Sequence, residues 1–116
     1  MKKFTITRSN WLCGEGGRVS FLLRSSDGKK CCLGQYATAC GIPDKNIINI
    51  QTPLAYDDFA PVVDGDAPLR ELASEENEYI ISQIMAINDG LHFGPVREDR
   101  LIEEFKRLGI EVDFVD

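Results

Sequence analysis

The sequence predicts an α+β domain in which a small antiparallel sheet of about four strands carries about three helices packed on one face. Short stretches near both ends alternate apolar and polar residues, which is typical of half-buried strands. Apolar residues recur at helical spacing in the second half, and a turn followed by a short helical stretch lies in the first half. Because 116 residues suffice for one core but not for two, we expect residues 1–116 to form a single domain.

The first half is expected to contribute three strands and one short helix. Asp27-Gly28 is a strong hairpin signal, and Gly41 ahead of Pro43 marks the place where the helix stops. The expected elements are strands at Lys3–Arg8, Arg18–Arg24 and Lys29–Leu33 and a helix at Gly34–Cys40. The side chains that these elements would bury together are Leu22, Cys32, Leu33, Tyr36 and Cys40.

The second half is expected to contain two amphipathic helices and a last strand. Residues 42–73 precede them as a long irregular connection, and connections of this length are often functional. Ser74 can cap the first of these helices, whereas Gly90 and Gly109 suit the left-handed position after a helix end. Ile110–Val115 alternates cleanly and predicts the last strand. The expected buried stripe of the last helix is Leu101, Ile102, Phe105 and Leu108.

Charge is unevenly distributed along the chain. Residues 1–53 hold eight basic and three acidic residues, a balance of +5, whereas residues 54–116 hold 5 and 16, a balance of −11, which together give the net charge of −6. The acidic half is either a solvated surface beside the basic half or a face for a basic protein partner. The net sign disfavours direct nucleic-acid binding. The candidate partner-binding residues are Asp57, Asp58, Asp64, Asp66, Glu103 and Glu104.

The sequence shows no membrane or export signal. No apolar run approaches the roughly 20 residues that a membrane-spanning helix needs. The two lysines near the start are not followed by the apolar stretch of a secretory signal. We therefore expect a cytoplasmic protein that has no membrane partner.

Four cysteines and one histidine are the residues most capable of chemistry. We interpret the cysteines as reduced, space-filling side chains, because no export signal accompanies them and the adjacent pair could form a disulfide only with strain. None has the spacing that makes a zinc site convincing, and a cysteine nucleophile would need the lone histidine as its base. We expect no catalytic residue, no cofactor and no metal. A metal site remains an open alternative for Cys13, Cys31, Cys32, Cys40 and His92.

Two short motifs resemble those of uncharacterised small proteins from bacteriophages and prophages. The first is the box Cys31-Cys32-Leu33-Gly34, which opens a short helix and follows an aromatic, glycine-rich segment beginning at Trp11. The second is the box Ile87-Asn88-Asp89 at the end of a later apolar helix. The resemblance covers roughly residues 11–41 and 79–115 and implies a phage or mobile-element protein acting in a bacterial host cell. It carries over no catalytic residues.

The two boxes also make physical sense as one contact. The side chains of Asn88 and Asp89 can hydrogen-bond to the backbone near Cys32, Leu33 and Gly34 and so tie the helix end to the hairpin. We favour this structural role over a binding role for the motif.

The function predicted from these observations is that of a non-enzymatic accessory protein that binds and modulates a host or phage protein. An inhibitor of a bacterial defence enzyme or nucleic-acid enzyme is one form of this function. The alternative is a small-ligand or nucleotide-binding module that uses the glycine turn at residues 14–17 and a pocket between hairpin and helix. Homodimerisation through the terminal strand is also open, because an unpaired strand edge is a template for pairing.

Overall fold

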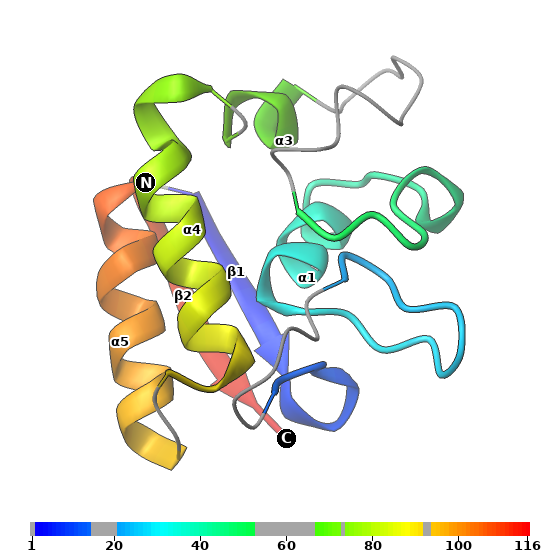
Figure 1. Cartoon of the computed structure of the whole chain (residues 1–116), viewed down its shortest axis with the longest axis horizontal. Coiled ribbons are helices and arrows are strands. Elements are labelled where there is room, and N and C mark those ends of the chain that lie inside the picture. Colours follow the sequence, from blue (N-terminus) through cyan, green and yellow to red (C-terminus); the bar gives the residue numbers. More distant parts are fainter. Residues whose placement is uncertain (1, 15–20, 53–66, 73, 92–93) are drawn as a thin grey trace.

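The computed structural model describes residues 2–14, 21–52, 67–72, 74–91 and 94–116 (Figure 1). Within these ranges, two strands and four α-helices form the framework, joined by single turns of other helix types. The strands and α-helices are β1 (Lys2–Thr7), α1 (Cys32–Ala39), α3 (Ala67–Leu72), α4 (Glu78–Ala86), α5 (Gly94–Arg107) and β2 (Ile110–Val115). The short turns are η1 (Arg8–Asn10), η2 (Asp44–Asn46), η4 (Glu75–Asn77) and η5 (Ile87–Leu91).

The sheet consists of β1 and β2 running parallel, from the pair Lys2 and Ile110 to the pair Thr7 and Val115. The prediction of an antiparallel sheet of about four strands is therefore wrong. Both strands alternate as expected, so each buries one face and exposes the other. The two strands come from opposite ends of the chain. No local sequence pattern indicates whether strands so far apart in the sequence pair in parallel or antiparallel.

The region around Cys31 forms a turn but no strand. Arg24 N donates to Lys29 O (2.8 Å), and Gly28 has φ +73°, so the predicted turn is present. Residues 21–31 contribute only isolated bridges, and Arg18–Ser20 of the predicted second strand lie outside the described residues. The third predicted strand is absent because α1 already begins at Cys32, which leaves the chain after the turn too short to extend along a neighbour.

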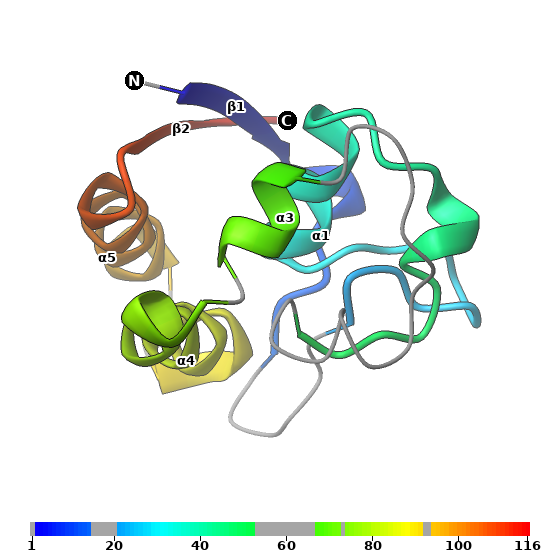
Figure 2. The same cartoon turned by 90° about the horizontal axis from the view of Figure 1, so that it is seen from above.

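The helices α1, α4 and α5 lie on one side of the two strands (Figure 2). The opposite side of the sheet carries exposed polar residues, among them Lys3, Thr5, Glu111 and Asp113. At the buried side, Phe4 of β1 stacks edge-on against Tyr36 of α1 and Phe105 of α5, with ring centroids 5.2 Å apart in both pairs. This aromatic contact joins the sheet to helices from both halves of the chain.

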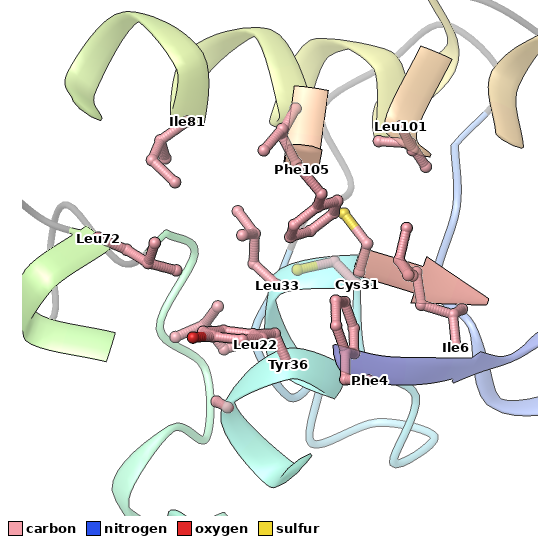
Figure 3. Packing of buried hydrophobic residues seen from close by; sticks show 14 of the residues in the cluster. Phe4, Ile6, Leu22, Cys31, Leu33, Tyr36, Leu72, Ile81, Leu101 and Phe105 are labelled. Carbon is pink, nitrogen blue, oxygen red and sulfur yellow. The ribbon is translucent and has the colours of Figure 1, made fainter. Parts of the chain in front are cut away.

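The core draws side chains from every α-helix and from both strands (Figure 3). Cys31, at the start of α1, lies among them. The part of residues 42–73 that the structure describes is more ordered than predicted, since it includes η2 and α3 and buries Ile47 and Leu72. The last helix buries Leu101 and Phe105 as expected, but Ile102 is 37% exposed, so the predicted stripe is too wide.

The predicted helix ends are confirmed in two places. Gly109, with φ +76°, follows α5 directly before β2. Gly90, with φ +121°, lies in the wide turn η5 that continues from α4. Ser74 precedes η4 in an extended conformation but makes no side-chain cap hydrogen bond.

Candidate functional site

Asn88 is a buried amide that joins three segments of the chain, and we call this set of contacts the Asn88 junction. Its Oδ1 accepts from Trp11 Nε1 (2.7 Å) and from the backbone N of Cys32 (3.2 Å). Its Nδ2 donates to Leu12 O (2.8 Å), and its carbonyl accepts from Gly14 N (2.9 Å). Asn88 is fully buried, so its polar atoms depend on these partners rather than on water.

The Asn88 junction brings the two sequence motifs together. The contact between Asn88 and the backbone at Cys32 was predicted, and the structure contains it. The indole of Trp11 donates to the same amide oxygen, a contact that the sequence did not predict. Because each polar atom of the side chain serves the fold, the geometry supports a structural role for the junction.

Gly34 explains the last position of the Cys-Cys-Leu-Gly box. A Cβ added at Gly34 would lie 1.8 Å from Leu22 O, closer than any real contact. Helix α1 therefore passes directly against the backbone of Leu22, which itself donates to Ile50 O (2.7 Å). Only glycine permits this approach.

The adjacent thiols are buried and held in their protonated form. The pKa of Cys31 is raised to about 12, chiefly by burial and to a smaller extent by the nearby carboxylate of Asp89, while backbone hydrogen bonds oppose the shift. Burial also raises the pKa of Cys32 well above its usual value, and the neighbouring Cys31 adds to the effect. A thiol must be deprotonated to act as a nucleophile or as a metal ligand, so this environment opposes both roles.

The other candidate ligands differ in their exposure. Cys13 is exposed, Cys40 is partly buried, and His92 lies outside the described residues. In the described part of the chain, no three side chains of the metal-binding types come close enough to hold an ion.

The predicted partner-binding acids differ in whether the structure describes them and in how exposed they are. Asp57, Asp58, Asp64 and Asp66 lie outside the described residues. Glu103 is exposed on α5 and pairs with Arg100 (3.2 Å). Glu104 is buried and pairs with Arg107 (3.1 Å), so its carboxylate is not presented on an open face. The two neighbouring glutamates therefore do not form one acidic surface, because successive helix positions point in different directions.

Two basic residues of the first half neutralise acids of the second half. Lys3 Nζ lies 3.2 Å from one carboxylate and 4.0 Å from another, and Arg8 makes contacts of 2.7 and 3.1 Å. In the order of these distances, the acids are Asp113 and Glu111 for Lys3, and Glu98 and Asp116 for Arg8. Part of the charge asymmetry is thus an internal pairing of the two halves.

A different group of acids remains uncompensated within the described residues. Glu75, Glu76 and Glu78 are exposed and make no ion pair with another described residue, and Tyr79 beside them is 66% exposed. They lie where η4 passes into α4, next to α3 (Figure 1). We call these four residues the acidic corner. Glu75 and Glu76 lie in the first turn of η4, where acidic side chains interact favourably with the helix dipole.

Arg97 is a functional candidate that the sequence pattern did not reveal. Its side chain is buried, Nη2 donates to Gly14 O (2.7 Å), and the guanidinium lies 5.9 Å from the ring centre of Trp11. Gly14 is the one residue of the predicted glycine turn that the structure describes. An arginine in the first turn of a charged helix gives no local sequence signal that its side chain is buried.

No α-helix in the described ranges has the length and apolar character needed to span a bilayer. Comparison with protein-family models, with curated protein sequences and with solved structures found no match.

Proposed function

We propose that the chain is a non-enzymatic accessory protein of a phage or mobile element that binds a partner protein through the acidic corner and modulates it. The partner chemistry is a basic surface, such as the nucleic-acid-binding face of a host defence or nucleic-acid enzyme. The observation that carries the proposal is the exposure of Glu75, Glu76 and Glu78 around an exposed tyrosine. Tyrosine is enriched among residues that dominate binding energies, and surrounding acids steer a basic partner.

The arrangement of the remaining charge supports the same conclusion. Lys3 and Arg8 already neutralise acids near the sheet, whereas the acidic corner has no such compensation from the described residues. An uncompensated patch of one sign raises the association rate with an oppositely charged surface. The environment of Cys31 and Cys32 favours inert thiols, which supports a binding role over a cysteine-based reaction.

Partner capture with two charge-reversed variants tests the proposal. One variant carries Glu75→Lys and Glu76→Lys, and the matched control carries Asp99→Lys and Glu103→Lys on α5, where both side chains are exposed. The net charge changes equally in both. We expect the first variant to lose capture of the wild-type partner from bacterial lysate and the control to retain it.

Loss of capture in both variants would mean that capture depends only on the total charge of the protein. Retention of capture in both would mean that the acidic corner is not part of the interface. The captured protein must also bind the purified chain directly, with an affinity that falls by about tenfold or more for Glu75→Lys with Glu76→Lys. A partner whose activity is unchanged by saturating amounts of the chain would refute modulation.

The alternative function is a small-ligand or nucleotide-binding module beside the glycine turn. It is favoured by one observation, the buried guanidinium of Arg97 at Gly14 O. That guanidinium already serves the fold through Gly14 and Trp11, so the alternative has less support. A thermal-shift screen against nucleotides discriminates the two, because a ligand that binds only the folded state raises the melting temperature.

A further inference from the structure

The two outer edges of the β1–β2 sheet differ. The edge of β1 is covered at Thr7, where Gln35 of α1 accepts from Thr7 N (2.8 Å) and donates to Thr7 O (3.1 Å). The amide of Gln35 therefore bonds to β1 as a neighbouring strand would. In the parts of the chain that the structure describes, no backbone or side-chain group outside β1 hydrogen-bonds to the backbone of β2. The outer edge of β2 thus presents backbone donors and acceptors to a further strand.

The surroundings of this edge define the strand that would fit it. On the solvent face, Glu111 and Asp113 are about half exposed and lie two residues apart, on the same side of β2. Lys3 on the neighbouring strand β1 reaches both carboxylates, which shows that a basic side chain on an adjacent strand is placed to pair with them. A lysine or arginine on a strand at the other edge would stand in the equivalent position.

The core side of the same edge is apolar. Helix α5 packs against β2 (Figure 1). Ile102 lies one turn after Glu98, the residue that bonds to Arg8 at the end of β1, so both side chains are on the side of α5 that faces the sheet. Ile102 is 37% exposed there. A strand added to β2 would cover it with inward-pointing apolar side chains.

A second copy of this chain fits the edge poorly. Two β2 strands related by a two-fold axis run antiparallel, and their apolar residues must stay on the core side. Every such register that pairs the middle of the strand sets Glu111 or Asp113 opposite another acid of the same face. Like charges directly opposite each other destabilise a strand pair, so self-pairing is disfavoured.

We propose that the outer edge of β2 binds an extended segment of a partner protein in which basic residues alternate with apolar ones, and that this segment adds a third strand to the sheet. Backbone hydrogen bonds supply affinity, while Glu111 and Asp113 select basic residues at alternate positions. The site is separate from the acidic corner, so it does not depend on the function proposed above.

A labelled peptide of alternating lysine and valine is the probe, and a peptide of alternating glutamate and valine is its control. Fluorescence anisotropy with the full chain measures affinity, and amide hydrogen exchange locates the bound peptide. We expect saturable binding of the lysine peptide only, with slower exchange in residues 110–115. Glu111→Lys with Asp113→Lys should weaken binding by about tenfold or more, and Glu75→Lys with Glu76→Lys by no more than about twofold.

Three results would overturn the proposal. The first is binding without added protection in residues 110–115, which would place the peptide elsewhere. The second is equal loss in both double variants, which would mean attraction by total charge. The third is a dimer of the unliganded chain in sedimentation that the β2 variant abolishes, because a second copy would then occupy the edge. Exchange data on the unmodified chain remain decisive if the β2 variant fails to fold.

Discussion

At the scale of single residues, Asn88 and Gly34 account for the two sequence motifs. Asn88 satisfies polar groups from two other segments at one buried point, and Gly34 removes a side chain where α1 crosses the backbone of Leu22. Cys31 and Cys32 are buried in the core as protonated thiols. All four act through packing and hydrogen bonding.

Replacing Asn88 with alanine should destabilise the fold strongly. The variant leaves Trp11 Nε1, Cys32 N and Leu12 O buried without their partner, and we expect the free energy of unfolding to fall by about 3 kcal/mol. Asn77→Ala is the control, because Asn77 makes one exposed hydrogen bond to Glu71 O, and it should cost about 0.5 kcal/mol. Urea unfolding measures both. Equal midpoints for the two variants would contradict the role of the junction.

The buried thiols should make the protein less stable at alkaline pH. The thiol of Cys31 ionises near pH 9.0 in an unfolded chain, but its pKa in the folded protein is raised to about 12, so the folded state binds more protons between these values. Stability is therefore full below about pH 9 and falls above it, by roughly 1.4 kcal/mol per pH unit for this one group. Chemical denaturation at pH 7 to 11 measures the slope.

Variants separate this effect from general alkaline unfolding. Cys31→Ala should flatten the slope relative to its own stability at pH 7, whereas Cys13→Ala should keep the wild-type slope because Cys13 is exposed. Burial also raises the pKa of Cys32 and of Tyr36, so part of the slope remains in both variants. The same slope in Cys31→Ala and wild type would show that the thiol is not the source.

At the scale of elements, local patterns succeeded for the ends of helices and failed for the pairing of strands. Gly109 and the apolar positions Leu101 and Phe105 define α5 by short-range rules, and the structure agrees. The segment after Asp27-Gly28 was predicted as a strand because Asp27-Gly28 is a hairpin signal. From Cys32 on, this segment forms α1 instead. The hydrogen bond of Cys32 N to Asn88 and the close packing of Gly34 against Leu22 stabilise the helix there.

The contact between α1 and Leu22 gives a prediction with an unusual sign. Glycine to alanine inside a helix is ordinarily stabilising by about 0.5 to 1 kcal/mol. At Gly34 the added methyl would overlap Leu22 O, so we expect Gly34→Ala to lower the free energy of unfolding by about 2 kcal/mol or more.

Gly41→Ala is the matched control for that variant. Gly41 lies just after α1 with φ +87° and has open space around it, so the substitution costs only backbone strain, about 1 kcal/mol. Thermal unfolding of the two variants ranks the costs. A Gly34→Ala protein as stable as wild type would refute the close crossing.

At the scale of the whole molecule, the ends of the chain meet. Arg8 bonds to Asp116 across a sequence separation of 108 residues, and β1 pairs with β2 beside it. Such contacts add to the core only after the intervening chain has been ordered, which slows folding but makes the domain cooperative. Interior residues of both strands, Phe4 and Val112 among them, belong to the same core.

Removal of β2 should therefore unfold the whole domain rather than cause only a local loss of structure. Deletion of residues 110–116 leaves β1 without its neighbouring strand and removes Ile110 and Val112 from the core, so we expect loss of the cooperative thermal transition in circular dichroism. Deletion of Asp116 alone removes one exposed partner of Arg8 and should cost less than about 1 kcal/mol. A cooperative transition in the longer deletion would show that the sheet is dispensable.

The sequence by itself determined the turn at Gly28, the ends of α5, the alternation of the first and last strands and the meeting of the two motifs at Asn88, because each depends on neighbouring residues or on a scarce polar group that must be buried with partners. Only the tertiary structure decided that the strands pair in parallel, that Glu104 is buried while Glu75 is exposed, and that one strand edge is covered by Gln35 and the other is not. The physical reason is that strand direction, burial and charge pairing arise between residues far apart in the chain. The local secondary-structure propensity of a residue does not predict which distant residue it will contact.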